Sequence, residues 1–256
     1  MHIADALISP TVAVAMDILS ASLMVVAVRQ VKHSRTEGIV PLMGALGAFV
    51  LAAQMVNFAI PGTGSSGHLI GGVLLSALLG PWAALLVLSS VVIVQCLLFA
   101  DGGLLALGCN VFNMAVCSCL IAYPLVFRPL MRPTASWARL LTVCMLTSIV
   151  GLELGAFMVT AETALSGVSA LTFSRFLLFM LPIHLPIAVG EGLATAALLA
   201  FVQRYRPEML MAGQPPVRRR SLWMVVGVAL LIALGAWWGA SSLPDGLEWS
   251  IEKTLE

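Results

Sequence analysis

The first two residues of the chain and one histidine further along it have the nitrogen donors to bind a transition metal. Met1 and His2 offer the terminal amine, the backbone nitrogen of His2 and its imidazole Nδ1. These donors close a five-membered and a six-membered ring on a metal ion, so the chelate is nearly flat and leaves one in-plane position. His68, at the end of the glycine-rich stretch 62–68, can fill it. Four nitrogens in a plane suit Ni(II) or Cu(II), whereas Zn(II) prefers a tetrahedron.

This chemistry requires a free amino terminus. His2 is bulky, so we expect the initiator methionine before it to be kept. No cationic residue precedes the first apolar run, and the signal-peptide pattern is therefore absent. Because the amine and the imidazoles bind only when deprotonated, metal affinity should weaken as the pH falls. A Met-His start alone is more often without chemical meaning, so the interpretation depends on where the rest of the chain places this end.

The composition indicates an integral membrane protein. Of the 256 residues, 60% are hydrophobic and only 10% are charged, and the mean hydropathy is +1.03. A soluble domain carries about 25% charged residues. The five cysteines lie within apolar runs and match no zinc motif, so we interpret them as small packing residues. The net charge of +1 gives no sign of a nucleic-acid partner.

Eight apolar segments predict an all-α, polytopic integral membrane protein. The third segment is short and ends at Gly80-Pro81, where a helix must stop or bend, so we expect a half-spanning or tilted piece that lines a cavity. The segments are approximately 10–29, 39–60, 68–79, 81–100, 103–127, 138–165, 172–203 and 222–240.

The charged residues predict an orientation and a domain boundary. Lys and Arg gather in three clusters that follow the first, fifth and seventh segments, which the positive-inside rule places in the cytoplasm. The amino end and the His68 loop then both face outward. We expect residues 1–205 to form a seven-helix core, 206–220 a basic linker, and 221–256 one carboxy-terminal transmembrane helix with an acidic tail.

Four ionisable residues lie within apolar segments, namely Asp17, Glu153, His184 and Glu191. Such residues are functional candidates, and they could form a cation path. They could equally belong to a structural hydrogen-bond network between helices, which we favour because many amides and hydroxyls are available as partners. The sequence contains no nucleotide-binding phosphate loop, no His-Glu-x-x-His motif and no evident catalytic triad, so nothing indicates an enzyme.

A metal-bound imidazole usually gives its second N–H to an oxygen acceptor. The candidates for this supporting role are Asn57, Ser66 and Asp101, which lie near the expected outer face. Asp5 could do the same or could cap the first helix.

The chain resembles the CbiM/NikM family, the substrate-capture membrane subunits (S components) of nickel and cobalt energy-coupling-factor (ECF) transporters. The resemblance covers residues 1–203. Residues 244–249, Pro-Asp-Gly-Leu-Glu-Trp, are similar to the "PDGLE" segment of companion or fused parts of these systems. The matching stretches are 1–5, 57–61, 66–72, 79–84, 101–108, 110–114, 184–186 and 190–192.

The resemblance implies a metal site made of Met1, His2 and His68. It also implies partners, namely a coupling transmembrane subunit, cytoplasmic ATPase subunits and an optional small accessory membrane subunit, but no resident cofactor. The expected setting is the plasma membrane of a prokaryote, with the amino terminus outside. Many relatives begin Met-His-Ile-Met-Glu-Gly, whereas this chain begins Met-His-Ile-Ala-Asp-Ala, so its opening does not choose between nickel and cobalt.

We therefore expect high-affinity capture of Ni(II) or Co(II) outside and delivery inward, powered by partner ATPases. One alternative is a stand-alone, proton-coupled secondary transporter with Glu153 and Glu191 as proton carriers. The other is a membrane enzyme or assembly factor of the cobalamin pathway, for which the sequence supplies no catalytic constellation.

Overall fold

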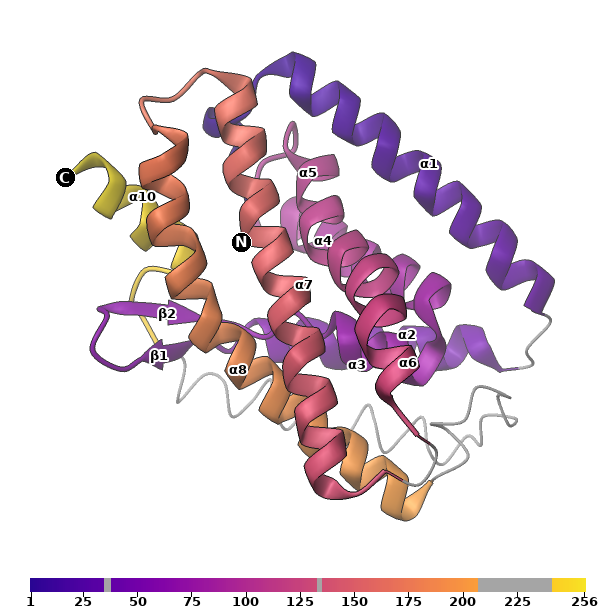
Figure 1. The fold of residues 1–256 in the computed structure, drawn as a ribbon. Coiled ribbons are helices and arrows are strands. Elements are labelled where there is room, and N and C mark those ends of the chain that lie inside the picture. The colour runs from indigo at the N-terminus through magenta and orange to yellow at the C-terminus, as the bar shows by residue number, and fades with distance from the viewer. Residues whose placement is uncertain (35–37, 133–134, 207–240) are drawn as a thin grey trace.

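Long helices dominate the structure, a computed structural model that describes residues 1–34, 38–132, 135–206 and 241–256 (Figure 1). Within these ranges, five helical stretches are long and apolar enough to cross a membrane. The all-α, multi-pass architecture predicted from the apolar segments is confirmed. The five stretches are α1 (Pro10–Ser34), α4 (Pro81–Phe99), the continuous run Leu107–Leu130, α7 (Trp137–Ser166) and α8 (Phe173–Tyr205).

The second predicted span differs from the expectation, and the third agrees with it. The second ends early, because α2 (Ile39–Gln54) is followed by a turn and a strand instead of continuing to residue 60. The third contains only α3 (Gly72–Leu79), whose 8 residues rise about 12 Å and cannot cross a hydrocarbon core of about 30 Å. The expected half-spanning piece is therefore correct. The eighth span and most of the linker, residues 207–240, lie outside the described residues.

A short hairpin replaces the end of the second span and carries the loop that precedes α3. Strand β1 (Phe58–Ile60) pairs antiparallel with β2 (Ser65–Gly67), and Phe58 lies opposite Gly67. Gly62 and Gly64 in the connection have φ values of 78° and 74°, a left-handed conformation that favours glycine. The hairpin thus turns the chain back so that His68 follows directly after β2.

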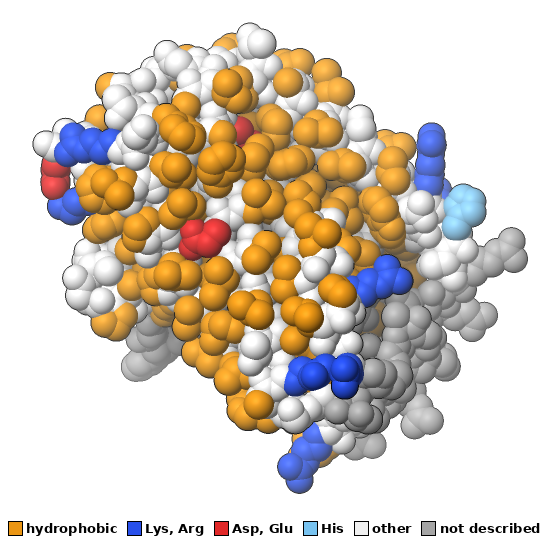
Figure 2. Space-filling model, viewed as in Figure 1, with side chains coloured by type: hydrophobic (Ala, Val, Ile, Leu, Met, Phe, Trp, Pro, Cys, Tyr) orange, Lys and Arg blue, Asp and Glu red, His pale blue; other side chains and the backbone are white. Residues whose placement is uncertain are grey.

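The remaining elements join or cap the long helices. The run Leu107–Leu130 consists of α5 (Leu107–Val111), the π-helical η2 (Phe112–Phe127) and α6 (Arg128–Leu130). A short turn, η1 (Asp5–Leu7), precedes α1, and α10 (Gly246–Leu255) lies beside α8 in Figure 1. Figure 2 shows apolar side chains over most of one face, with basic side chains near its margin, as a lipid-facing surface requires.

Close helix packing depends on glycines at the contacts. A Cβ atom at Gly192 of α8 would lie 2.7 Å from the Cα of Met145 on α7, so any larger residue forces these two helices apart. Between α1 and α5 the same holds at Gly108, where a Cβ would overlap the backbone of Asp17. The side chain of Asp17 accepts the Gly108 N–H at 2.7 Å, and Ser20 donates to the Gly108 carbonyl at 2.7 Å.

We predict that Gly108→Ala destabilises the protein, because the added methyl group separates α1 from α5 and breaks the bond to Asp17. The expected loss is about 1–3 kcal/mol, the usual range for overpacking. It would be measured as a lower unfolding midpoint in detergent. Gly44→Ala on α2 is the matched control, because nothing lies within 4 Å of a Cβ at that position. Equal midpoints for both variants would contradict this packing argument.

Candidate metal site at the amino terminus

The amino terminus is inside the protein. Met1 is 5% exposed, His2 8% and Ile3 0%. The backbone of Ile3 is held on both sides, because its N–H donates to Asn110 Oδ1 at 2.7 Å and its carbonyl accepts from Asn110 Nδ2 at 3.1 Å and from the Gly103 N–H at 2.8 Å. These bonds fix the position of the amine, which would otherwise be among the least ordered groups of the chain.

The two histidines predicted to share a site lie side by side. The rings of His2 and His68 are stacked, with centroids 5.5 Å apart and planes at 21°. His2 Nδ1 lies 3.1 Å from Asp101 Oδ1, in the loop after α4. Burial opposes the charged form of Asp101, but the hydrogen bond and the charge of His2 lower its pKa. Asp101 thus remains an acceptor for the imidazole.

The orientation of the His2 ring bears on the chelate. A Met1–His2 chelate uses Nδ1, which in this structure faces Asp101, while Nε2 is buried without a hydrogen-bond partner. Binding of a metal ion through Nδ1 would require the ring to turn so that Nδ1 leaves Asp101 and Nε2 becomes the partner of the carboxylate. The carboxylate can then accept the second N–H, the usual arrangement for a metal-bound imidazole.

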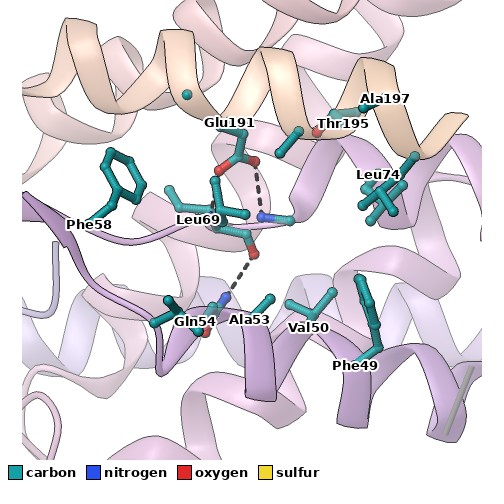
Figure 3. A pocket seen from close by; sticks show the side chains of 16 residues that line it. Phe49, Val50, Ala53, Gln54, Phe58, Leu69, Leu74, Glu191, Thr195 and Ala197 are labelled. Atoms are coloured by element: carbon teal, nitrogen blue, oxygen red, sulfur yellow. Dashed lines mark hydrogen bonds between the residues drawn. The ribbon is translucent and has the colours of Figure 1, made fainter. Parts of the chain in front are cut away.

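Glu191 of α8 holds the loop that carries His68. Its two carboxylate oxygens accept the N–H groups of Ile70, at 2.5 Å, and Gly71, at 2.9 Å. From the opposite side, Gln54 Nε2 donates to the Ile70 carbonyl at 2.7 Å, and Figure 3 shows both side chains converging on the loop. The apolar pocket drawn there, of ≈ 540 Å³, lies between α2 and α8. Glu191 therefore has the structural role that the sequence favoured.

The environment of His68 keeps its ring neutral. Burial, followed by the charges of the Met1 amine and His2, lowers the pKa of His68 to about 4. Its Nδ1 lies 3.1 Å from the Leu69 carbonyl, so Nδ1 carries the proton and Nε2 has the free lone pair. A neutral imidazole with one free nitrogen is the form that binds a metal ion.

The carboxy-terminal residues 241–256, here called the tail, complete the site. Asp245 Oδ2 lies 3.4 Å from the Met1 amine. Asp245 also caps α10, because its Oδ1 accepts the Glu248 N–H at 2.8 Å. Burial opposes its charge, but the Met1 amine and the Glu248 N–H outweigh burial and hold the pKa of Asp245 well below its usual value. The sequence analysis did not place Asp245 at the site.

A small cavity lies where these groups meet. Its volume is ≈ 10 Å³, close to what one water molecule needs. His184 of α8 is part of the wall, and its Nδ1 lies 2.8 Å from the Met180 carbonyl. The lining residues are Met1, Gly67, His68, Ile70, Leu152, His184, Ile187, Asp245 and Gly246.

Side chains alone do not form a metal site here. No group of three His, Cys, Asp or Glu residues is placed to hold a metal ion in the described part of the chain. The Met1–His2 chelate expected from the sequence would add the terminal amine and a backbone nitrogen as donors.

Of the three residues expected to accept the second N–H of a histidine, only one lies beside a histidine ring. Asp101 contacts His2, as described above. Ser66 and Asn57 instead hold the tail: Ser66 Oγ donates to the Leu243 carbonyl at 2.8 Å, and the Asn57 carbonyl accepts the Ser241 N–H at 2.8 Å. The sequence analysis gave Asn110 and Asp245 no role at the site, although they lie in the stretches 110–114 and 244–249 that match known segments.

Comparison with known proteins agrees with these observations. Residues 2–209 match the CbiM family model, described as a cobalt uptake substrate-specific transmembrane region, and residues 219–256 match the PDGLE domain model. A putative fused nickel transport protein, NikMN, of Archaeoglobus fulgidus is 33% identical over 84% of this chain and 70% of its own length. A fused nickel transport protein, NikMN, of Rhodobacter capsulatus is 30% identical over 96% of this chain and 76% of its own length.

A solved structure has the same fold. The crystal structure of a truncated transition metal transporter matches with a TM-score of 0.69 and 29% identity, over 80% of this chain and 99% of that one. The resemblance inferred from the sequence motifs is thus confirmed. The chain belongs to the CbiM family and ends in a PDGLE domain.

Proposed function

We propose that this protein captures Ni(II) or Co(II) outside the cell and delivers it inward as the substrate-specific membrane subunit of an ECF-type transporter. One observation carries the proposal: the buried residues Met1 and His2 lie against His68, with the rings of His2 and His68 stacked, and Met1 and His68 line a small cavity. Relatives named as nickel and cobalt transport proteins support the same metals. The protein lies in the plasma membrane in this proposal, and the positive-inside rule supports an amino terminus on the outer side.

The donor set favours nickel. Affinity of nitrogen sites for divalent first-row metals rises from cobalt to nickel. The flat chelate of Met1 and His2 with His68 suits the square-planar geometry that Ni(II) adopts. The site therefore binds Ni(II) more tightly than Co(II), and supply of each metal decides which one is carried.

Transport needs an energy source outside the described site. Partner ATPases and a coupling membrane subunit fill this role in the proposal, with movement of the whole chain against the coupling subunit exposing the site inward. A proton-coupled secondary transporter would use Glu153 and Glu191 as carriers, yet both oxygens of Glu191 accept backbone N–H groups. Copurification tests the choice, because a secondary transporter needs no ATPase for uptake.

We predict one equivalent of Ni(II) in a square-planar, all-nitrogen site. His2→Ala and His68→Ala should each abolish tight binding, because each removes an in-plane donor. His33→Ala is the control, since His33 is exposed at the end of α1. X-ray absorption on the loaded protein checks the geometry, and sulfur ligands or a tetrahedral shell would rule it out.

A second prediction depends on the amine itself. One residue added before Met1 moves the histidine to position three, where an amine, two amides and the imidazole fill all four in-plane positions and exclude His68. The extended protein should still bind Ni(II) but lose uptake, and acetylation of the natural terminus should abolish binding. One residue added after Glu256, which is exposed, is the control. Unchanged uptake by the amino-terminally extended protein would refute the site.

A third prediction concerns orientation. Single cysteines at Glu252, in the tail, and at Lys32, at the end of α1, are both exposed positions. In a background without the native cysteines, an impermeant thiol reagent added to whole cells should label position 252 and leave position 32 unlabelled until the cells are permeabilised. The reverse pattern would show that the amino terminus and its site face the cytoplasm.

A further inference from the structure

We propose that Asp245 of the tail is a functional group of the metal site, which positions the Met1 amine and balances the charge of the bound ion. This inference rests on the proposed function. Its basis is the contact of 3.4 Å between Asp245 Oδ2 and the amine, together with the cavity that both residues line.

The tail is fastened next to His68, so the carboxylate has a defined position. Ser66 and Asp245 form a parallel bridge, in which the Ser66 N–H donates to the Pro244 carbonyl at 2.8 Å. The Ser66 hydroxyl adds a bond of 2.8 Å to the Leu243 carbonyl. Since His68 is two residues beyond Ser66, the same hairpin strand locates both the histidine and the carboxylate.

A second anchor lies on the other side of Asp245. Trp249 of α10 packs edge-on against Phe179 of α8, with centroids 5.9 Å apart, and Leu247 is buried. Asp245 caps this helix with Oδ1, which leaves Oδ2 directed at the amine. The carboxylate is therefore held between the hairpin and α8, and its two oxygens have separate tasks.

Charge gives the contact its role. A divalent ion bound by two neutral imidazoles, an amine and one backbone nitrogen keeps a net positive charge, because only the backbone nitrogen can be an anion. A buried charge without a counter-charge is unfavourable. Asp101 is in part solvated, with a side chain 40% exposed, whereas the Asp245 side chain is 23% exposed and faces the amine directly.

The carboxylate can serve the amine both with and without metal. Without metal it pairs with the charged amine. When the amine lone pair binds a metal ion, the nitrogen still has two hydrogens, and one of them can donate to Asp245 Oδ2. Carboxylates that hold a metal ligand in this way orient it, and their loss usually lowers metal affinity about 10- to 100-fold.

Two substitutions at position 245 separate charge from helix capping. Asp245→Asn keeps a good cap and removes the charge, whereas Asp245→Glu keeps the charge but replaces a preferred capping residue. The matched control is Glu252→Gln, which removes an exposed charge from the same helix. The measurement is Ni(II) affinity of the purified full-length chain by calorimetric titration, with the unfolding midpoint recorded for each variant.

We expect Asp245→Asn to weaken Ni(II) binding about 10- to 100-fold, Asp245→Glu to weaken it less, and Glu252→Gln to match the wild type. Wild-type affinity in Asp245→Asn would overturn the inference. So would a larger loss in Asp245→Glu, equal losses in both variants, or a loss in Glu252→Gln as large as in Asp245→Asn, because each assigns the effect to capping or to general charge.

The wild type and His2→Ala, measured in parallel, separate this inference from the proposed function. If the wild type does not bind Ni(II), or His2→Ala binds as tightly as the wild type, both the proposed function and the role of Asp245 fail. If the wild type binds and His2→Ala does not, but Asp245→Asn binds like the wild type, only the role of Asp245 fails.

Discussion

The hydrogen bonds that pin Ile3 to Asn110 and Gly103 are the constraint on which the site depends. They hold the first residues of the chain inside the protein, and His68, Asp101 and Asp245 then lie around that fixed end. A terminal amine is ordinarily solvated and disordered. Here both backbone groups of Ile3 have hydrogen-bond partners. Burying the terminus therefore leaves neither the Ile3 N–H nor the Ile3 carbonyl unpaired.

Three acidic residues near the site serve the backbone. Asp17 accepts an N–H at the start of α5, Asp5 accepts the Ala106 N–H at 3.1 Å, and Glu191 accepts two N–H groups ahead of α3. Each loop so held would otherwise place unpaired donors where no water is available. Asp17 and Glu191 lie within predicted membrane segments, where carboxylates are functional candidates by default, yet with Asp5 they hold in place the loops that surround the site.

The sequence predicted the long spans and the meeting of His2 with His68, because hydropathy and the positive-inside rule report on burial and on faces. It overestimated the second span, since residues 55–60 are mostly apolar but form a turn and a strand, of which residues 58–60 pair with residues 65–67. It missed Asp245 because pairing of residues 244 positions apart leaves no local pattern. Asn110 lies in the matching stretch 110–114, which gave it no specific role.

The contact between Met1 and Asp245 bears on the order in which parts of the protein fold. It joins Met1 to the residue that caps α10, and it therefore closes a loop of nearly the whole chain. Such a contact forms after the helices between its ends are in place, because the entropy of closing a long loop is recovered only once they pack. A nascent chain released before residue 245 would have both histidines but lack the carboxylate at the amine.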